Sequence, residues 1–157
     1  MIILSIETSC DETAISILEA EGEFPHATYN ILGNALWSQV DVHREYGGVF
    51  PMLAKREHVA IIVPMLEKAM LESELEAREH SHEIDTHLEE EIRTLLHREQ
   101  PLIDALFAFH KKYGSYAIDL IAVTSGPGLE PALWVGVNFA RALALLWNIS
   151  IVPVNHM

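Results

Sequence analysis

The sequence predicts an α/β domain in which helices flank a mixed β-sheet, in the order β-β-β-α-α-β-α-β. Three observations lead to this fold class. Strand-like apolar segments come first, a long segment with apolar residues at helical spacing follows, and a strand–turn–helix–strand pattern comes last. The 157 residues amount to one domain.

The first two predicted strands form a hairpin. Residues 2–6 are apolar and rich in β-branched side chains, and residues 14–18 resume this pattern after a polar loop. A loop near residues 22–25 follows, and we expect residues 29–42 to form a third strand.

The helical part of the sequence begins after a glycine pair. Gly47 and Gly48 interrupt the chain, and Pro51 suits the first turn of a helix, where proline is tolerated. Apolar residues then recur at helical spacing as far as Met70. Pro64 lies inside this pattern, so we expect it to kink or split the helix. A second helix is predicted over residues 102–112.

Residues from about 72 to 110 are expected to form an acidic helical insertion on the surface. Between Glu67 and Glu99 there are eleven acidic and four basic side chains, a net charge of −7 within the −13 of the whole chain. Four histidines lie in this stretch: His80, His82, His87 and His97. Because no pair of them has the i,i+4 spacing of ligands on one helix face, we expect a solvated helical hairpin or a mobile insertion rather than a metal site.

The last part of the sequence alternates strand and helix. Residues 118–124 predict a buried strand, residues 131–147 a helix and residues 149–154 a final strand. A buried parallel strand is normally followed by a covering helix. We therefore expect the fold to continue beyond residue 157.

Composition limits the possible functions. The net charge of −13 argues against this chain alone gripping a nucleic-acid backbone, which requires clustered Lys and Arg. No apolar run reaches the ~18 residues of a membrane span.

The single cysteine, Cys10, permits no internal disulfide and fits a reducing, cytoplasmic compartment; we expect it to be buried. We also expect Trp37, Trp134 and Trp147 to pack in or at the edge of the core.

Three segments carry candidate functional residues. The loop with Thr8, Ser9, Asp11 and Glu12 offers hydroxyls and amides to phosphate oxygens and a carboxylate to a cation. The turn with Ser125, Gly126 and Gly128 lets the backbone approach a ligand closely. His156, after the last strand, stands where open α/β sheets bind ligands. Each has a plainer alternative: a polar hairpin, a strand-to-helix turn and a structural histidine.

Four segments, in the same order, resemble motifs of the TsaD/Gcp/YgjD family of tRNA N6-adenosine threonylcarbamoyltransferases. Residues 6–14 (IETSCDETA) are similar to the opening motif of the family, and residues 47–58 (GGVFPMLAKREH) to its second. Residues 125–129 (SGPGL) are similar to its third motif, and residues 153–157 (PVNHM) to the start of its metal motif.

The resemblance implies one half of an actin/Hsp70/sugar-kinase-like (ASKHA-type, ribonuclease H-like) fold, with the ligand cleft between two such halves. It also implies a reaction in which a threonylcarbamoyl group passes from its adenylate to N6 of the adenosine 3′ of the tRNA anticodon. Because that exocyclic amine is a poor nucleophile, catalysis would depend on positioning and on a metal ion. The resemblance further implies that residues 1–157 are the N-terminal domain, with the C-terminal domain absent from this sequence. By themselves these residues are expected to be inactive.

The resemblance also implies roles and partners. It assigns catalysis to Asp11 and Glu12, nucleotide or substrate binding to Thr8, Ser9, Ser125, Gly126 and Gly128, and metal binding to His156. The implied cofactor is one divalent ion, iron or zinc, with ATP or threonylcarbamoyl-adenylate as ligand. The implied partners are a TsaB-like paralogue and a TsaE-like ATPase, or KEOPS-type subunits, together with tRNA. The helix that begins at Pro51 is expected to dock a partner subunit.

Two other functions fit parts of the sequence. A non-catalytic, TsaB-like interaction module would share the fold, but it would not need the Asp11–Glu12 loop or the histidine ending. Half of a generic sugar kinase or Hsp70-like ATPase is the other alternative, and residues 47–58 and 125–129 argue against it.

Overall fold

The computed structural model describes residues 1–23, 25–78 and 83–157, and its centre is a five-stranded mixed sheet in the order β3-β2-β1-β6-β7. The strands are β1 (Ile2–Glu7), β2 (Glu12–Glu21), β3 (Thr28–Ser38), β6 (Leu120–Gly126) and β7 (Ser150–Asn155). β1 and β3 run antiparallel to β2, whereas β6 runs parallel to both β1 and β7. The predicted mixed sheet is confirmed.

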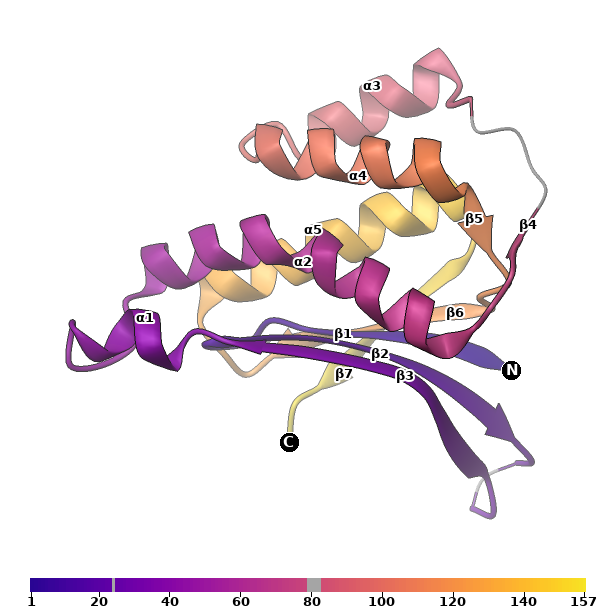
Figure 1. The fold of residues 1–157 in the computed structure, drawn as a ribbon, viewed down its shortest axis with the longest axis horizontal. Helices are drawn as coiled ribbons and strands as arrows, with labels where there is room; N and C mark the ends of the chain where they lie inside the picture. The colour runs from indigo at the N-terminus through magenta and orange to yellow at the C-terminus, as the bar shows by residue number, and fades with distance from the viewer. Residues whose placement is uncertain (24, 79–82) are drawn as a thin grey trace.

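Helices cover one face of this sheet (Figure 1). They are α1 (Val40–Arg44), α2 (Pro51–Ser73), α3 (Thr86–Leu95), α4 (Gln100–Tyr113) and α5 (Glu130–Trp147). α2 and α5 lie next to the sheet, and α3 and α4 form an outer layer (Figure 1). Two short strands, β4 (Ala77–Arg78) and β5 (Ser115–Tyr116), pair with each other beside these helices.

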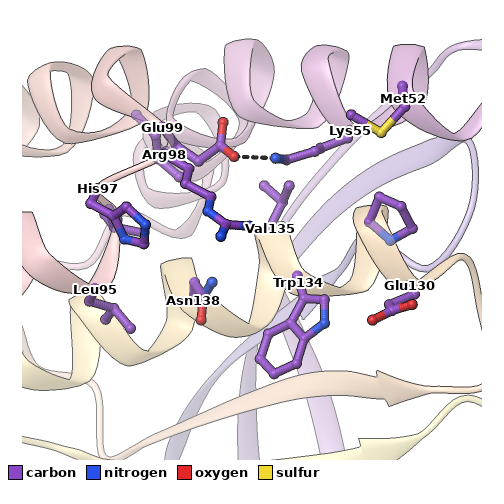
Figure 2. Close-up of a pocket in the computed structure, with 13 residues that line it drawn as sticks. Met52, Lys55, Leu95, His97, Arg98, Glu99, Glu130, Trp134, Val135 and Asn138 are labelled. Atoms are coloured by element: carbon purple, nitrogen blue, oxygen red, sulfur yellow. Dashed lines mark ion pairs between the residues drawn. The ribbon is translucent and has the colours of Figure 1, made fainter.

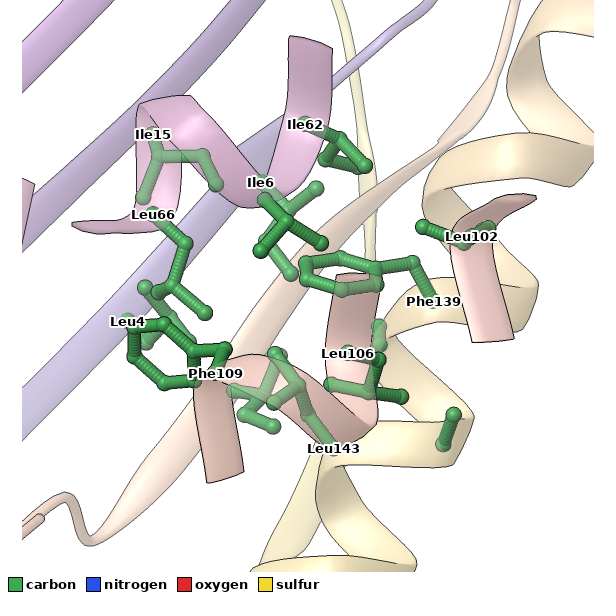
Figure 3. Close-up of a cluster of buried hydrophobic side chains, with 14 of the residues drawn as sticks. Leu4, Ile6, Ile15, Ile62, Leu66, Leu102, Leu106, Phe109, Phe139 and Leu143 are labelled. Atoms are coloured by element: carbon green, nitrogen blue, oxygen red, sulfur yellow. The ribbon is translucent and has the colours of Figure 1, made fainter. Parts of the chain in front are cut away.

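The alternating pattern of the first two strands explains why one face of the sheet is covered. Leu4 and Ile6 of β1, and Ile15 and Ile17 of β2, all point to the helical side and are at most 2% exposed. Figure 3 shows Leu4, Ile6 and Ile15 meeting side chains of α2, α4 and α5 in one apolar cluster, to which Ile17 also belongs. The residues between them, such as Ser5 and Ser16, face the other way because side chains alternate along a strand.

α2 is continuous across Pro64, so the predicted split of this helix is wrong. Pro64 lacks the N–H that would donate to the carbonyl of Ala60, but the flanking turns are held by burial of Ile62, Val63 and Leu66. Figure 1 shows the two halves of α2 inclined differently, which agrees with the expected kink.

The acidic stretch contributes to the core as well as to the surface. Ile92 of α3 is fully buried, and so are Leu102 and Leu106 of α4. Ion pairs join the same stretch to α2: Lys55 contacts Glu99, and Lys112 lies 2.7 Å from Glu67. The charged positions thus occupy the outer side of helices whose inner side packs on α2 and α5. His80 and His82 lie outside the described residues, and His87 and His97 are exposed.

Several local predictions differ from the structure. The third strand ends at Ser38, not Val42, because the backbone N–H of Gln39 donates to the carbonyl of Asp11 and the chain turns into α1. Cys10 and Trp134 are exposed, whereas Trp147 is buried as expected. The last strand, β7, is largely exposed rather than buried, since it forms an edge of the sheet.

Gly33 should be the most sensitive glycine of the sheet. A Cβ at this position would lie 2.2 Å from the carbonyl oxygen of Ala69 in α2, a backbone atom that cannot move aside. We expect Gly33→Ala to lower the free energy of unfolding by about 2–3 kcal/mol in a urea titration. Gly48, where a Cβ would meet nothing within 4 Å, provides the control, and Gly48→Ala should cost less than about 0.5 kcal/mol. Equal losses in the two variants would contradict this close approach.

Candidate functional site

The three candidate segments meet at one edge of the sheet. β1, β6 and β7 run parallel, so the loop after β1, the turn after β6 and the residues after β7 emerge at the same ends of their strands. Hydrogen bonds join these segments directly. The N–H of Leu129 donates to the carbonyl of Ser9 at 2.7 Å, and the N–H of His156 donates to the carbonyl of Gly126 at 2.8 Å. The hydroxyl of Ser125 donates to the carbonyl of Val154 at 3.3 Å.

Small residues allow the loop and the α5 segment to approach each other closely. A Cβ on Gly128 would lie 2.6 Å from the carbonyl oxygen of Ser9, and one on Gly136 would lie 2.4 Å from Oγ1 of Thr8. Thr8 is 1% exposed, and its hydroxyl donates to the carbonyl of Ala132 at 2.9 Å. Thr8 therefore fixes the loop against α5. Ser9 is also buried, at 6% exposed.

Glu7 organises a polar cluster that includes His156, a role that was not predicted from the sequence. Its carboxylate accepts hydrogen bonds from the Ser9 N–H and the Thr124 hydroxyl, and its Oε2 lies 3.0 Å from Nδ1 of His156. Oγ of Ser9 lies 3.4 Å from the same nitrogen. Burial alone would raise the pKa of Glu7, but the hydrogen bonds from Ser9, Thr124 and His156 outweigh it and hold that pKa below its ordinary value. The one sequence signal was an acidic residue at the end of an apolar strand.

Asp11 presents an accessible carboxylate at the tip of the loop. Asp11 is partly exposed, and Glu12, where β2 begins, is exposed. Burial and the neighbouring Asp11 carboxylate, which accepts from the thiol, raise the pKa of Cys10. The candidate side chains available to a ligand are therefore those of Asp11, Glu12, Ser125 and His156, whereas Thr8 and Ser9 are buried and support the loop from beneath.

His156 fits one ligand of a metal ion. Its Nδ1 faces the Glu7 carboxylate, which leaves the lone pair of Nε2 free to bind a metal ion. Carboxylates orient metal-binding imidazoles in this way. The side chain is 49% exposed, so Nε2 is accessible. Within the described residues no group of three or more His, Cys, Asp or Glu side chains could hold a metal ion together. The remaining ligands would have to come from other residues.

A separate pocket of about 490 Å³ lies between α2, the α3–α4 turn and α5 (Figure 2). The Lys55–Glu99 ion pair forms one wall, and the Arg98 side chain extends into the space above Asn138. None of the candidate residues lines this pocket. The site at the strand ends and this pocket are thus different places in the fold.

Among the described residues, no helix combines the length and apolar character needed to cross a bilayer.

The fold and the site together define a class of protein. The strand order, with an antiparallel β1–β2–β3 meander and parallel β6 and β7, is that of a ribonuclease H-like, ASKHA-type half. Its candidate site lies at the carboxyl ends of the parallel strands, where such sheets bind ligands.

Comparison with known proteins identifies the family. A model of the tRNA N6-adenosine threonylcarbamoyltransferase family, TsaD, matches residues 30–82 and 89–157. A curated protein of that name from Thermomicrobium roseum is 39% identical over all 157 residues, and the chain spans 31% of its length. The chain belongs to the tRNA N6-adenosine threonylcarbamoyltransferase family.

One solved structure with a related shape is YeaZ from Pseudomonas aeruginosa. It matches with a TM-score of 0.45 and 14% identity, over 98% of this chain and 43% of that one. The family match also bears on the acidic stretch. Residues 83–88 are the unmatched part between the two matched ranges, so most of the range from 72 to 110 lies within the family model.

Glu7 should stabilise the fold in a pH-dependent way. Its pKa is lowered in the folded state, so its contribution is present above the ordinary carboxyl pKa and is lost as the pH falls through the folded value. We expect Glu7→Gln to cost about 1–2 kcal/mol at pH 7 and progressively less as the pH falls below about 4, where the native carboxyl is protonated too. Urea titrations between pH 3 and pH 8 measure this, with the exposed Glu21→Gln as control. A cost that does not change with pH would contradict the role of the Glu7 charge.

Proposed function

We propose that this chain takes part in forming threonylcarbamoyladenosine on tRNA. In the proposed reaction a threonylcarbamoyl group passes from its adenylate to N6 of the adenosine 3′ of the anticodon. Family membership supports this proposal. The structural observation behind it is the hydrogen bond from Leu129 to Ser9, which holds the Asp11 loop against the glycine-containing turn.

The arrangement of these segments suggests how each would act. The turn around Gly126 and Gly128 would receive the adenylate, because its backbone is not shielded by side chains and it leads into the N-terminus of α5. Asp11 would orient the exocyclic amine and accept its proton. The N6 nitrogen would bond to the carbamoyl carbon as the bond from that carbon to the phosphate oxygen breaks, releasing AMP. Glu12 would contribute a second carboxylate at the rim of the loop.

A divalent metal ion, iron or zinc, is proposed to be held in part by Nε2 of His156. When bound, such an ion would stabilise the carbonyl oxygen or the leaving phosphate. Glu7 would keep the imidazole oriented through Nδ1. Residues 1–157 alone are proposed to be inactive, since the described residues hold no complete ligand set.

The charge of the chain suggests that tRNA is held mainly elsewhere. With a net charge of −13, this segment would repel the phosphate backbone, so partners or other parts of the protein would supply the basic surface. The proposed partners are a TsaB-like paralogue and a TsaE-like ATPase, or KEOPS-type subunits, in the cytoplasm. The core-facing residues of α2 are buried against the rest of the domain, so a partner would meet its exposed start at Phe50 and Met52.

Asp11→Asn tests the proposed catalytic role most directly. In the intact chain with its partners, we expect the rate of threonylcarbamoyl transfer to tRNA to fall about 10²–10⁴-fold while partner binding is unchanged. Mass spectrometry of the tRNA nucleosides measures the product, and co-purification measures partner binding. Asp41→Asn, at an exposed acid of α1, is the matched control and should retain full activity. Normal transfer by Asp11→Asn would remove Asp11 from the mechanism.

A further inference from the structure

A chain of buried polar side chains runs beneath the Asp11 loop. His58 of α2 and Thr13 of β2 are fully buried, Gln39 before α1 is also fully buried, and His43 of α1 is 3% exposed. His58 belongs to the second family-like motif, residues 47–58, which the proposed reaction leaves unused. Buried polar groups are costly unless they are hydrogen-bonded, so the arrangement of these bonds shows what the chain of side chains does.

The hydrogen bonds indicate where the hydrogens of the two imidazole rings lie. The carbonyl of Cys10 can only accept, so Nε2 of His58, 3.1 Å away, carries a hydrogen. Nδ1 of His58 lies 2.7 Å from the hydroxyl of Thr13, which donates to this nitrogen when the ring is neutral. In the same way, Nε2 of His43 donates to Oε1 of Gln39 at 2.9 Å, and Nδ1 of His43 accepts from the N–H of Phe50 at 3.4 Å. Burial, the largest influence, lowers the pKa of His58, in agreement with a neutral ring.

Three consecutive carbonyl groups of the loop each accept a hydrogen bond from a different segment of the fold. The carbonyl of Ser9 accepts from the N–H of Leu129 at 2.7 Å, and the carbonyl of Asp11 accepts from the N–H of Gln39 at 2.8 Å. Between them, the carbonyl of Cys10 accepts from Nε2 of His58. His58 is the one of these three donors that is a side chain, so it can be removed without changing the backbone.

Ala54, another residue of this motif, supports the contact between His58 and the loop by way of Gln39. Ala54 is fully buried one turn before His58, and its carbonyl accepts from Nε2 of Gln39 at 3.4 Å. Nε2 of Gln39 also lies 3.4 Å from each of the two ring nitrogens of His58. Gln39 therefore joins α1, α2 and the loop at one point, and it leaves the imidazole little freedom to rotate.

We propose that His58 is a positioning residue: through its hydrogen bond to the Cys10 carbonyl, it holds the loop in the conformation that presents the Asp11 carboxylate. This inference rests on the proposed function for its effect on transfer. It makes a separate claim about the order of the loop, which can be measured without any reaction.

Cys10 provides the probe for that claim. Its thiol is exposed on the same residue whose carbonyl His58 holds, and the neighbouring Asp11 and burial keep its pKa raised. If the loop becomes mobile, the thiol separates from the carboxylate and reacts faster. The rate of modification of Cys10 by iodoacetamide, followed by mass spectrometry of the peptide that contains it, therefore reports loop order in the intact chain.

Two substitutions whose side chains differ by one methylene group distinguish loss of this hydrogen bond from loss of packing around His58. The amide nitrogen of Gln in His58→Gln can occupy the place of Nε2 and donate to Cys10. The shorter Asn in His58→Asn reaches only the place of Nδ1, beside Thr13. We expect His58→Asn to raise the modification rate of Cys10 about fivefold, the factor equivalent to one hydrogen bond, and His58→Gln to stay within about twofold of the unchanged chain. His97→Asn, at an exposed histidine, is the surface control.

Transfer assays on the same variants connect loop order to the reaction. We expect His58→Asn to lower kcat with little change in KM for tRNA, and His58→Gln to restore most of kcat. Circular dichroism and thermal melting verify that each variant is folded. Unchanged Cys10 modification in folded His58→Asn, or equally fast modification in both variants, would overturn the proposal. Faster modification of Cys10 with unchanged kcat would support the contact between His58 and the loop, but it would contradict the proposed role of the loop in transfer.

Discussion

The parallel pairing of β1 with β6, and of β6 with β7, is the constraint on which the candidate site depends. In this register Ile6 pairs with Val123, and Thr124 with Val154, so the segments that follow the three strands begin side by side. An antiparallel β6 would place residues 125–128 at the opposite edge of the sheet from the loop after β1. Each contact within the site follows from this topology, including the one between Glu7 and His156, which are 149 positions apart in the sequence.

Close packing and hydrogen bonding then hold the segments of the site against one another. Gly128 and Gly136 allow the backbone of α5 and its preceding turn to touch Ser9 and Thr8, positions at which any side chain would collide. The carbonyls of Ser9, Cys10 and Asp11 all accept hydrogen bonds from donors of the protein, while the Asp11 side chain stays partly exposed. The proposed transfer to a weak nucleophile would benefit from groups that are already oriented, because no free energy would then be spent on arranging them during the reaction.

Much of the fold was predictable because its signals are local. Alternating apolar residues identified β1 and β2, helical spacing identified α2 and α5, and the serine–glycine turn marked the junction of β6 with α5. The end of β3 and the continuity of α2 across Pro64 were not predictable in this way, since they depend on contacts of Gln39 with the loop and on burial around the proline.

The candidate site shows the same division between local and long-range information. Sequence motifs found Asp11, Ser125 and His156, which the fold does bring to one edge of the sheet. They did not show that Thr8 and Ser9 are buried supports, nor that Glu7 orients the histidine, because these roles arise only when distant strands pair. A crystal structure of the intact chain with a non-hydrolysable threonylcarbamoyl-adenylate analogue would show whether the loop, the turn and His156 form one ligand site. We expect the phosphate to lie against residues 125–128 and the carbamoyl group beside Asp11. A ligand found in the pocket between α2, α3 and α5 instead, with the strand ends empty, would contradict it.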